Sequence, residues 1–308
     1  MNILVTGGAG FIGSHLVETL LNRGHAVRVL DNFSSGSRDN LSTTEQLEVV
    51  EGDVRDLKTV SAAARDCHAI VHLAAVASVQ ASVEDPLVTH QVNFIGTLNL
   101  LETARQQGID KFVFASSAAV YGNTETLPVS ETCTPAPLTP YAADKLASEH
   151  YIDFYSRQHG LKPFIFRFFN VYGPRQNPTS PYSGVISIFI DRMLKGELLT
   201  LFGDGEQTRD FIYVADLSRL IADSLEQEAG VSTPLNVGCQ KQTSLNQLLK
   251  VLRELTGRDC IVAQAPPRAG DIRHSLADTR LLLEAFGFRQ EFSLVDGLKE
   301  TLEWAVNQ

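Results

Sequence analysis

Three side chains of this sequence could together carry out proton transfer. Tyr141 and Lys145 stand four residues apart, and Ser117 lies upstream of both. Residues four apart on a helix share a face, so the phenol and the ammonium would point the same way. A free tyrosine has a pKa of about 10, and a neighbouring positive charge favours the phenolate. We therefore expect the pKa of Tyr141 to be lowered toward neutrality, where a tyrosine can act as a general base.

The residues around these three support a catalytic arrangement. Thr139 and Pro140 predict a helix that starts just before Tyr141, with threonine as the N-cap and proline in the first position. The apolar run at 112–115 predicts a strand at 112–116, and Ser117 follows it. Parallel sheets bind ligands at the carboxyl ends of their strands. The Ser117 hydroxyl could share the proton relay or hold the reacting oxygen. A Tyr-x-x-x-Lys pair alone is a weak signal, so its interpretation depends on the rest of the chain.

A glycine cluster opens the chain and predicts a dinucleotide site. It lies between an expected strand at 2–6 and an expected helix at 11–23, and comprises Gly7, Gly8, Gly10 and Gly13. Such glycines let the backbone approach a pyrophosphate at the positive end of the helix. Asp31 ends the next expected strand, where its carboxylate can bind a ribose and would repel a 2′-phosphate. The sequence therefore favours NAD over NADP, and the positive nicotinamide would further favour a Tyr141 phenolate.

Strands and helices alternate over the first 170 or so residues. We expect strands at 2–6, 26–31, 47–51, 69–73, 112–116 and 164–167, and helices at 11–23, 57–65, 86–107 and 140–159. This alternation predicts an α/β fold with a doubly wound parallel Rossmann sheet covered on both faces.

The pattern changes after residue 174, and a smaller C-terminal α/β lobe is expected. We assign residues 1–174 to the NAD-binding domain, with a return contribution from about 211–240, and residues 175–308 mainly to an interleaved substrate lobe. Further elements are expected as helices at 185–195, 214–227, 245–256, 279–286 and 294–306, a strand at 235–238, and a turn at 202–205 between short strands.

Charge and cysteine usage exclude several classes of function. The formal net charge of −10, without any dense run of lysine and arginine, argues against a nucleic-acid surface. The four cysteines show no Cys-x-x-Cys spacing, so we expect free thiols, no disulfide framework and no metal site. No apolar run reaches about 18 residues, and a first strand at residue 2 leaves no room for a signal peptide. We expect a cytoplasmic protein without a membrane partner.

Together these segments resemble the extended short-chain dehydrogenase/reductase superfamily, and within it the UDP-sugar 4-epimerases. The resemblance covers essentially the whole chain and includes Gly52-Asp53-Val54, His72-Leu73-Ala74-Ala75, Ser116-Ser117, the stretch at 167–175 and Arg209-Asp210-Phe211. It implies that NAD is bound by Gly7, Gly10, Phe11, Ile12, Gly13, Asp31, Asn32, Ser34, Ser35, Gly36, Asp53, Val54, Leu73, Ala74, Ala75, Asn93, Tyr141 and Lys145.

The resemblance also implies a mechanism with Ser117, Tyr141 and Lys145 as catalytic residues. Tyr141 would take the proton of the sugar 4-hydroxyl while a hydride leaves C4, and the 4-keto sugar would turn before the hydride returns. Asn170, Arg209 and Arg268 would hold the diphosphate, Asp271 the ribose, and Ser275 would lie beside the sugar 2-substituent. Ser117, Tyr141 and Val185 complete the implied substrate contacts. The sequence 181–185 lacks the paired asparagines of some relatives, so sugar contacts from the loop at 176–186 are left open.

Two positions narrow the expected reaction. Related dehydratases and decarboxylases carry an acidic residue just after the catalytic serine or threonine, whereas this chain has Ala118 and Ala119 there. That favours epimerisation over elimination. In the family, a bulky tyrosine at the position of Ser275 excludes N-acetyl groups and a small residue admits them. We therefore expect UDP-GlcNAc and UDP-GalNAc to be accepted as well as UDP-Glc and UDP-Gal.

Two other functions and an assembly complete the predictions. A UDP-glucuronate 4-epimerase would share these motifs but needs a cation near the sugar carboxylate, for which Arg175 or Arg192 could serve. A sensor that binds NAD without turnover belongs to another class, and such proteins usually lose the tyrosine or lysine. The resemblance also implies a homodimer in which the helices at 86–107 and 140–159 form a four-helix bundle.

Overall fold

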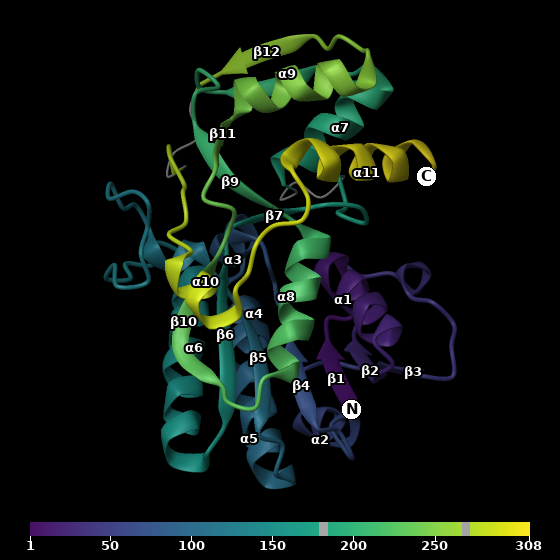
Figure 1. The fold of residues 1–308 in the computed structure, drawn as a ribbon, viewed down its shortest axis with the longest axis vertical. Helices are drawn as coiled ribbons and strands as arrows, with labels where there is room; N and C mark the ends of the chain where they lie inside the picture. Colours follow the sequence, from purple (N-terminus) through teal and green to yellow (C-terminus); the bar gives the residue numbers. More distant parts are fainter. Residues whose placement is uncertain (179–183, 267–271) are drawn as a thin grey trace. The chain divides into compact units, whose positions relative to one another are not determined.

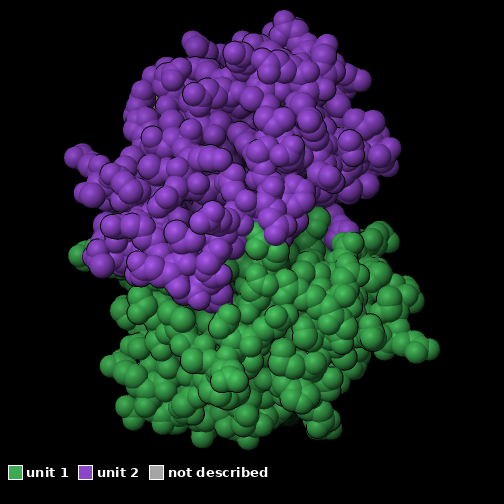
Figure 2. Space-filling view, viewed as in Figure 1, with its two compact units in different colours: residues 1–122, 134–168, 218–235 green, residues 123–133, 169–217, 236–308 purple. Residues whose placement is uncertain are grey.

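The computed structural model describes residues 1–178, 184–266 and 272–308. The chain divides into two compact units, which Figure 2 colours separately. Unit 1 comprises Met1–Gly122, Thr134–Phe168 and Ser218–Leu235, and unit 2 comprises Asn123–Cys133, Phe169–Leu217 and Asn236–Gln308. The domain boundaries expected from the sequence remain a prediction.

A large sheet forms the centre of unit 1 (Figure 1). Among the described residues it has seven strands in the order β10-β6-β5-β4-β1-β2-β3. The six from β6 to β3 pair in parallel. Their bounds are β1 Asn2–Thr6, β2 Ala26–Asp31, β3 Leu47–Glu51, β4 Ala69–His72, β5 Lys111–Ser117, β6 Lys162–Phe168 and β10 Val231–Val237. The predicted α/β fold with a doubly wound sheet is confirmed.

Helices cover both faces of this sheet. They are α1 Phe11–Asn22, α2 Leu57–Ala63, α3 Val79–Glu84, α4 Pro86–His90, α5 Gly96–Gln107, α6 Pro140–His159 and α8 Val214–Glu226, whose last residues belong to unit 1. On one face α2 packs against α5 and α5 against α6. At the end of α1, ion pairs from Arg23 to Asp223 and Glu226 bind it to α8.

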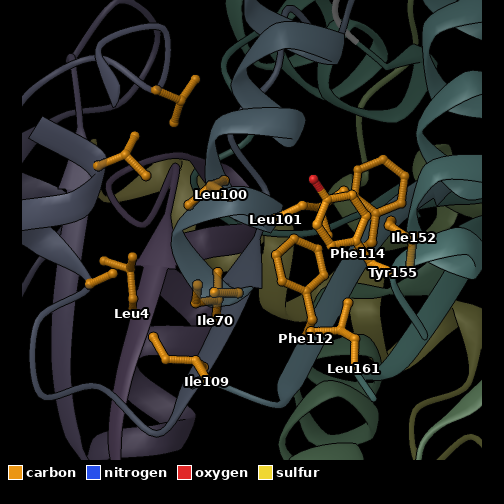
Figure 3. Packing of buried hydrophobic residues seen from close by; sticks show 14 of the residues in the cluster. Leu4, Ile70, Leu100, Leu101, Ile109, Phe112, Phe114, Ile152, Tyr155 and Leu161 are labelled. Atoms are coloured by element: carbon orange, nitrogen blue, oxygen red, sulfur yellow. The ribbon is translucent and has the colours of Figure 1, made fainter. Parts of the chain in front are cut away.

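The core beneath α2, α5 and α6 is apolar and closely packed. Leu4 from β1, Ile70 from β4 and Phe112 and Phe114 from β5 meet Leu100 of α5 there, and all are fully buried (Figure 3). The intervening β1 side chains Ile3 and Val5 are also buried, and successive residues of a strand point to opposite faces. A sheet buried on both faces accounts for the near-continuous apolar sequence of its strands.

The predicted helix at 86–107 is interrupted in one respect. Between α4 and α5 the residues Gln91–Ile95 form a π-helical turn, which adds one residue to the winding. The short helix α3 was not expected from the sequence. No helix in the described ranges is long and apolar enough to cross a membrane.

Unit 2 contains small sheets and several helices. In its described part β11, β9 and β7 form one sheet, in which β11 is antiparallel and β7 parallel to β9, and β12 pairs in parallel with β8. Helices α7, α9 and α11 pack on one another. The bounds are β7 Asn170–Tyr172, α7 Val185–Lys195, β8 Leu199–Phe202, β9 Thr208–Tyr213, β11 Gln242–Ser244, α9 Leu245–Thr256, β12 Val262–Ala265, α10 Arg280–Phe286 and α11 Leu294–Val306.

Candidate active site

The turn between β1 and α1 has no room for side chains at its tightest points. A Cβ on Gly13 would lie 2.1 Å from the carbonyl oxygen of Gly7, and one on Gly7 would lie 2.7 Å from the backbone nitrogen of Ala74. Helix α1 begins at Phe11 with Gly10 as its N-cap and without a side-chain cap. Close backbone approach and an uncapped helix N-terminus are what a pyrophosphate group requires, so this turn fits a dinucleotide.

Asp31 joins the end of β2 to the glycine turn. Its carboxylate accepts hydrogen bonds from the backbone N–H groups of Ala9, at 2.9 Å, and Phe33, at 2.8 Å. The segment 34–36 returns to the same turn, because a Cβ on Gly36 would lie 2.7 Å from the carbonyl oxygen of Ala9. A carboxylate has four lone-pair positions, so Asp31 can still accept ribose hydroxyls, and its charge opposes a 2′-phosphate.

Asp53 is held by a cation that was not predicted as a site residue. Arg55 donates to both of its carboxylate oxygens, at 2.9 and 2.8 Å, and the Asn32 amide donates at 3.0 Å. The hydrogen bond from Arg55 is the main reason that the pKa of Asp53 is lowered to about 2. Neighbouring Val54 is buried, and its side chain fills the space that a Cβ on Gly96 would need. Asp53 is therefore a fixed anion beside Asn32.

The end of β4 is anchored through a buried histidine. Thr6 Oγ1 lies 2.7 Å from His72 Nδ1, and His72 Nε2 lies 3.0 Å from Thr97 Oγ1. Burial, and then the charge of Lys145, keep the pKa of His72 well below its usual value. The hydroxyl of Thr6 also accepts from the N–H of Ala74 at 3.3 Å. A neutral histidine thus fixes the strand end from which Leu73, Ala74 and Ala75 follow.

The π-helical turn brings Asn93 to the same loop. Its amide accepts from the N–H of Val76 at 2.8 Å and donates to the carbonyl of Val76 at 3.1 Å. The side chain is 1% exposed, so its polar atoms are committed to the loop backbone. Asn93, predicted to bind the cofactor, therefore positions the loop at 74–76.

Ser117, Tyr141 and Lys145 come together in unit 1. Ser117 is the last residue of β5, and Thr139 caps α6 by accepting from the N–H of Ala142 at 3.4 Å. The hydroxyl of Ser117 hydrogen-bonds to Tyr141. The ammonium of Lys145 lies 5.9 Å from the centre of the Tyr141 ring and donates to a backbone carbonyl of β5 at 2.7 Å. The predicted cluster is thus present.

The protein's own groups do not lower the pKa of Tyr141, contrary to what was expected from the sequence. Burial raises the pKa of Tyr141, and the hydrogen bond with Ser117 only opposes that rise. Lys145 is 2% exposed, and burial lowers the pKa of its ammonium to about 8. One N–H of the ammonium donates to a β5 carbonyl, and its nitrogen lies 4.7 Å from the centre of the Phe114 ring and 5.9 Å from that of the Tyr141 ring. A lowered pKa of Tyr141 would have to come from the charge of a bound ligand.

Four polar residues behind the catalytic cluster were missed as site residues. Glu149 of α6 and Arg167 of β6 form a buried ion pair, to which Ser116 and Tyr121 are hydrogen-bonded. The sequence carried a signal for them. Glu149 follows Lys145 by four residues, on the same helix face, and Arg167 interrupts the otherwise apolar strand β6.

The predicted substrate residues of unit 2 lie on separate elements. Asn170 begins β7, Val185 begins α7, and Arg209 lies on β9, where its guanidinium donates to the carbonyl of Thr208 at 2.9 Å. Ser275 donates its backbone N–H to the same carbonyl, at 3.2 Å. The structure therefore brings Arg209 and Ser275 to one point of β9. Arg268 and Asp271 lie outside the described residues.

Asp210 holds this part of unit 2 together. Its carboxylate accepts from the backbone N–H groups of Cys239, Gln240 and Ala277 at 2.8, 3.1 and 3.0 Å. Burial raises its pKa to about 6, against the effect of these donors. The residue fixes β9 next to Arg209. It is a structural anchor, and the described residues contain no group of acidic, histidine or cysteine side chains that could hold a metal ion.

Comparison with known proteins agrees with this geometry. The model of the NAD dependent epimerase/dehydratase family matches residues 3–238. The chain belongs to this family. The protein is therefore an enzyme, and its cofactor is NAD. The parts of this chain that fit the cofactor are the glycine turn, Asp31 and the loops that follow β2, β3 and β4.

Relatives of this epimerase/dehydratase family member match nearly the whole of this chain. A crystal structure of UDP-glucose 4-epimerase with UDP-glucose from Thermotoga maritima is 42% identical, has a TM-score of 0.95 and matches 100% of this chain and 99% of its own. UDP-N-acetylglucosamine 4-epimerase from Methanobrevibacter ruminantium, in complex with UDP-N-acetylmuramic acid, is 38% identical with a TM-score of 0.95, over 100% of this chain and 98% of its own. UDP-glucose 4-epimerase of Mycolicibacterium smegmatis is 38% identical over 100% of this chain and 99% of its own. Decarboxylases of UDP-linked sugar acids also match, at 34% identity.

Proposed function

We propose that this protein catalyses the NAD-dependent 4-epimerisation of UDP-hexoses, including UDP-GlcNAc and UDP-GalNAc as well as UDP-Glc and UDP-Gal. One observation carries the proposal. Ser117 hydrogen-bonds to Tyr141 beside the buried Lys145, and the residues that follow Ser117 are Ala118 and Ala119. The cluster can move a proton at a sugar hydroxyl, and this stretch supplies no acid for elimination.

Tyr141 is the proposed acid–base residue. Bound NAD would supply the acceptor and donor of a hydride at C4. Tyr141 takes the proton from the 4-hydroxyl as C4 is oxidised, and it returns that proton to the oxygen when C4 is reduced on the opposite face. Ser117 is hydrogen-bonded to the phenol, so it can hold the reacting oxygen in line with it.

The sugar must turn between the two half-reactions, so it has to be held loosely. Binding energy should then be concentrated on the UDP. We propose that Asn170, Arg209 and Arg268 hold the diphosphate and that Asp271 holds the ribose. Arginine suits this task because its planar guanidinium binds phosphate oxygens with two parallel hydrogen bonds.

Direct assay of three nucleotide sugars tests the function. The purified protein is incubated without added reductant with UDP-GlcNAc, UDP-Glc or UDP-glucuronate, and the 4-epimers are separated by anion exchange and identified by NMR. Conversion of the first two supports the proposal. Turnover of UDP-glucuronate alone would favour the alternative substrate, for which relatives acting on UDP-linked sugar acids give a reason. No turnover of any of them, with NAD bound, would overturn the proposal and favour a sensor.

The variant Tyr141→Phe tests the role of the phenol. We expect turnover to fall by about 10²–10⁴-fold, because general acid–base catalysis is lost, while NAD stays bound. Tyr151→Phe is the matched control, since Tyr151 lies on the same helix, ten residues or about 15 Å beyond Tyr141, and its ring packs edge-to-face against Phe94. Equal activity of Tyr141→Phe and the wild type would contradict the assignment.

We also propose a homodimer in which the helices at 86–107 and 140–159 form a four-helix bundle, with α4 and α6 carrying most of the exposed apolar surface. These helices pack on each other and carry exposed apolar side chains, among them Leu87, Val88, Tyr151 and Phe154, which are 40–76% exposed. Val83 of α3 adds to the same surface, since α3 packs on both α4 and α6. A contiguous group of exposed apolar side chains is typical of a protein–protein interface, where their burial is favourable.

A further inference from the structure

A charged pair lies in the core of unit 1, directly behind the catalytic cluster. Arg167 donates to Glu149 through Nε at 2.9 Å and through Nη2 at 2.6 Å. Ser116 Oγ donates to the same carboxylate at 2.5 Å, and Arg167 Nη1 donates to Tyr121 Oη at 2.9 Å. The two charged side chains are only 4–5% exposed.

Stability alone is a weak reason for such a pair. Removing two charges from water costs free energy, and replacing a buried ion pair by apolar side chains is often neutral or stabilising. The hydrogen bonds described above give every polar side-chain atom of the pair a partner. The Arg167 guanidinium also lies 4.8 Å from the centre of the Tyr121 ring. A fully satisfied pair of this kind fixes the elements that carry it.

Those elements are the ones that carry the catalytic cluster. Tyr141, Lys145 and Glu149 follow one another at intervals of four on α6, so they share one face of the helix. Ser116 precedes Ser117 on β5, and it lies opposite Arg167 in the register of β5 and β6. Both of these β5 residues are therefore hydrogen-bonded to this face of α6. Ser117 is bonded to Tyr141, and Ser116 is bonded to Glu149.

Lys145 is bonded to the same strand. Its ammonium donates to the carbonyl of Ala115 at 2.7 Å, one residue before the serine that binds Glu149. Lys145 and Glu149, four residues apart on α6, are thus hydrogen-bonded to successive residues of β5. This spacing keeps the carboxylate within electrostatic reach of the ammonium inside the protein.

We propose that Glu149, held by Arg167 and Ser116, is a positioning residue that keeps the Lys145 ammonium charged and aligned with Tyr141. The inference rests on the proposed function, in which Lys145 acts with Ser117 and Tyr141 as the family resemblance implies. Glu149 does not reach the reacting atoms. It acts through Lys145 and through the strand end that carries Ser117.

The electrostatic surroundings of Lys145 support this role. Burial lowers the pKa of Lys145 to about 8, and the negative charges of Asp144 and Glu149 oppose that fall. The titratable group facing it from β4 is His72, whose low pKa leaves it neutral, and Tyr141 faces it from its own helix. Loss of Glu149 should therefore let the ammonium release its proton at lower pH.

Asp144 is the other carboxylate near Lys145, and its effect on the pKa of Lys145 is the larger of the two. One of its oxygens lies 2.7 Å from His90 Nδ1, and the other is buried without a hydrogen-bond partner among the described residues. Glu149 differs from Asp144 in being joined to β5 through Ser116 and to β6 through Arg167. Its removal therefore tests the role of the buried pair.

The test measures the titration of Lys145 without using activity. Trace acylation at a series of pH values, followed by mass spectrometry of the Lys145 peptide, gives the midpoint at which the amine becomes reactive. In Glu149→Gln we expect the midpoint to move down by about one pH unit. The alkaline limb of the epimerase pH profile should move with it. An unchanged midpoint in folded protein would overturn the proposal.

Glu102→Gln is the matched control. Glu102 of α5 also accepts from an arginine, Arg105, and from a hydroxyl, that of Tyr155. Tyr155 lies ten residues beyond Lys145 on α6, a distance of about 15 Å along the helix, so this carboxylate should not affect the ammonium. A shift of the Lys145 midpoint as large in this variant would show a general effect and would also overturn the proposal.

A second variant covers a failure of the first to fold. Glu149→Gln/Arg167→Met removes both charges, so it leaves no unpaired cation in the core and should be better tolerated. It still deprives Lys145 of the carboxylate, and the midpoint should again fall. The outcome is separable from that of the proposed function. A shifted midpoint without turnover of any sugar would sink only the proposed substrates, and turnover with an unshifted midpoint would sink only this inference.

Discussion

The side chain at position 275 gives a direct test of sugar choice. Ser275 is partly exposed and is bonded through its N–H to the strand that carries Arg209. In Ser275→Tyr we expect kcat/KM for UDP-GlcNAc to fall by about tenfold or more, because the ring would occupy the space of the N-acetyl group, while UDP-Glc turnover is retained. Steady-state kinetics with both sugars measures this. Ser275→Ala keeps the site small and should accept both, and equal loss for both sugars in the tyrosine variant would contradict the gate.

Single residues also show how far the candidate site could be predicted. Ser117, Tyr141 and Lys145 were placed correctly together because a helix start and a strand end are local signals. The lowering of the Tyr141 pKa expected from Lys145 was wrong, because burial dominates the pKa of the phenol in the protein alone. Burial is a property of the packed molecule, and spacing along the chain does not contain it. The further lowering expected from the nicotinamide of NAD stays a prediction.

At the scale of elements, the turn between β1 and α1 is the most sensitive part of the cofactor site. In Gly13→Ala the added Cβ would overlap the carbonyl oxygen of Gly7, 2.1 Å away, so the turn must open. We expect NAD binding to weaken by about 1–3 kcal/mol, as for overpacked sites. Calorimetric titration with NAD and the cofactor content of the purified protein measure the loss.

A glycine just beyond the other end of α1 provides the control. Gly24 has a φ of 78° and nothing within 4 Å of a built Cβ, and asparagine tolerates this backbone region. Gly24→Asn should bind NAD as the wild type does. Retained NAD affinity in Gly13→Ala would mean that the turn does not approach the cofactor.

Elements differ in how well the sequence predicts them. The bounds of β1, β2, α6, α7, α9 and α11 agree with the prediction, because glycine turns, Thr-Pro and Ser caps and apolar periodicity mark them locally. Strands β7, β11 and β12 were missed. Each has only three or four residues, and β11 is defined by pairing with β9 more than 30 residues away in sequence. Only the apolar end of β10 was predicted, at 235–238. The start of this strand is polar and contains a proline, so the sequence did not indicate it.

At the scale of the whole molecule, the proposed assembly can be tested at one side chain. Leu87 of α4 is 76% exposed, more than any other large apolar side chain among the described residues. In Leu87→Arg we expect the dimer to dissociate at micromolar concentration, because a charge would be buried at the helix pair. Light scattering after gel filtration gives the mass. Ile261→Arg is the control, since Ile261 is 73% exposed but precedes β12 in unit 2. A monomeric wild type, or a dimeric Leu87→Arg variant, would contradict the proposal.

The division of the chain has a consequence for how such enzymes could diverge. The backbone passes between the two units after Gly122, Cys133, Phe168, Leu217 and Leu235. A single genetic crossover therefore cannot exchange one unit for its counterpart in another lineage, and a swap of everything after β6 would also replace β10, the strand that borders β6. New sugar specificity would then arise from substitutions at individual codons, for which the role proposed for Ser275 gives an example.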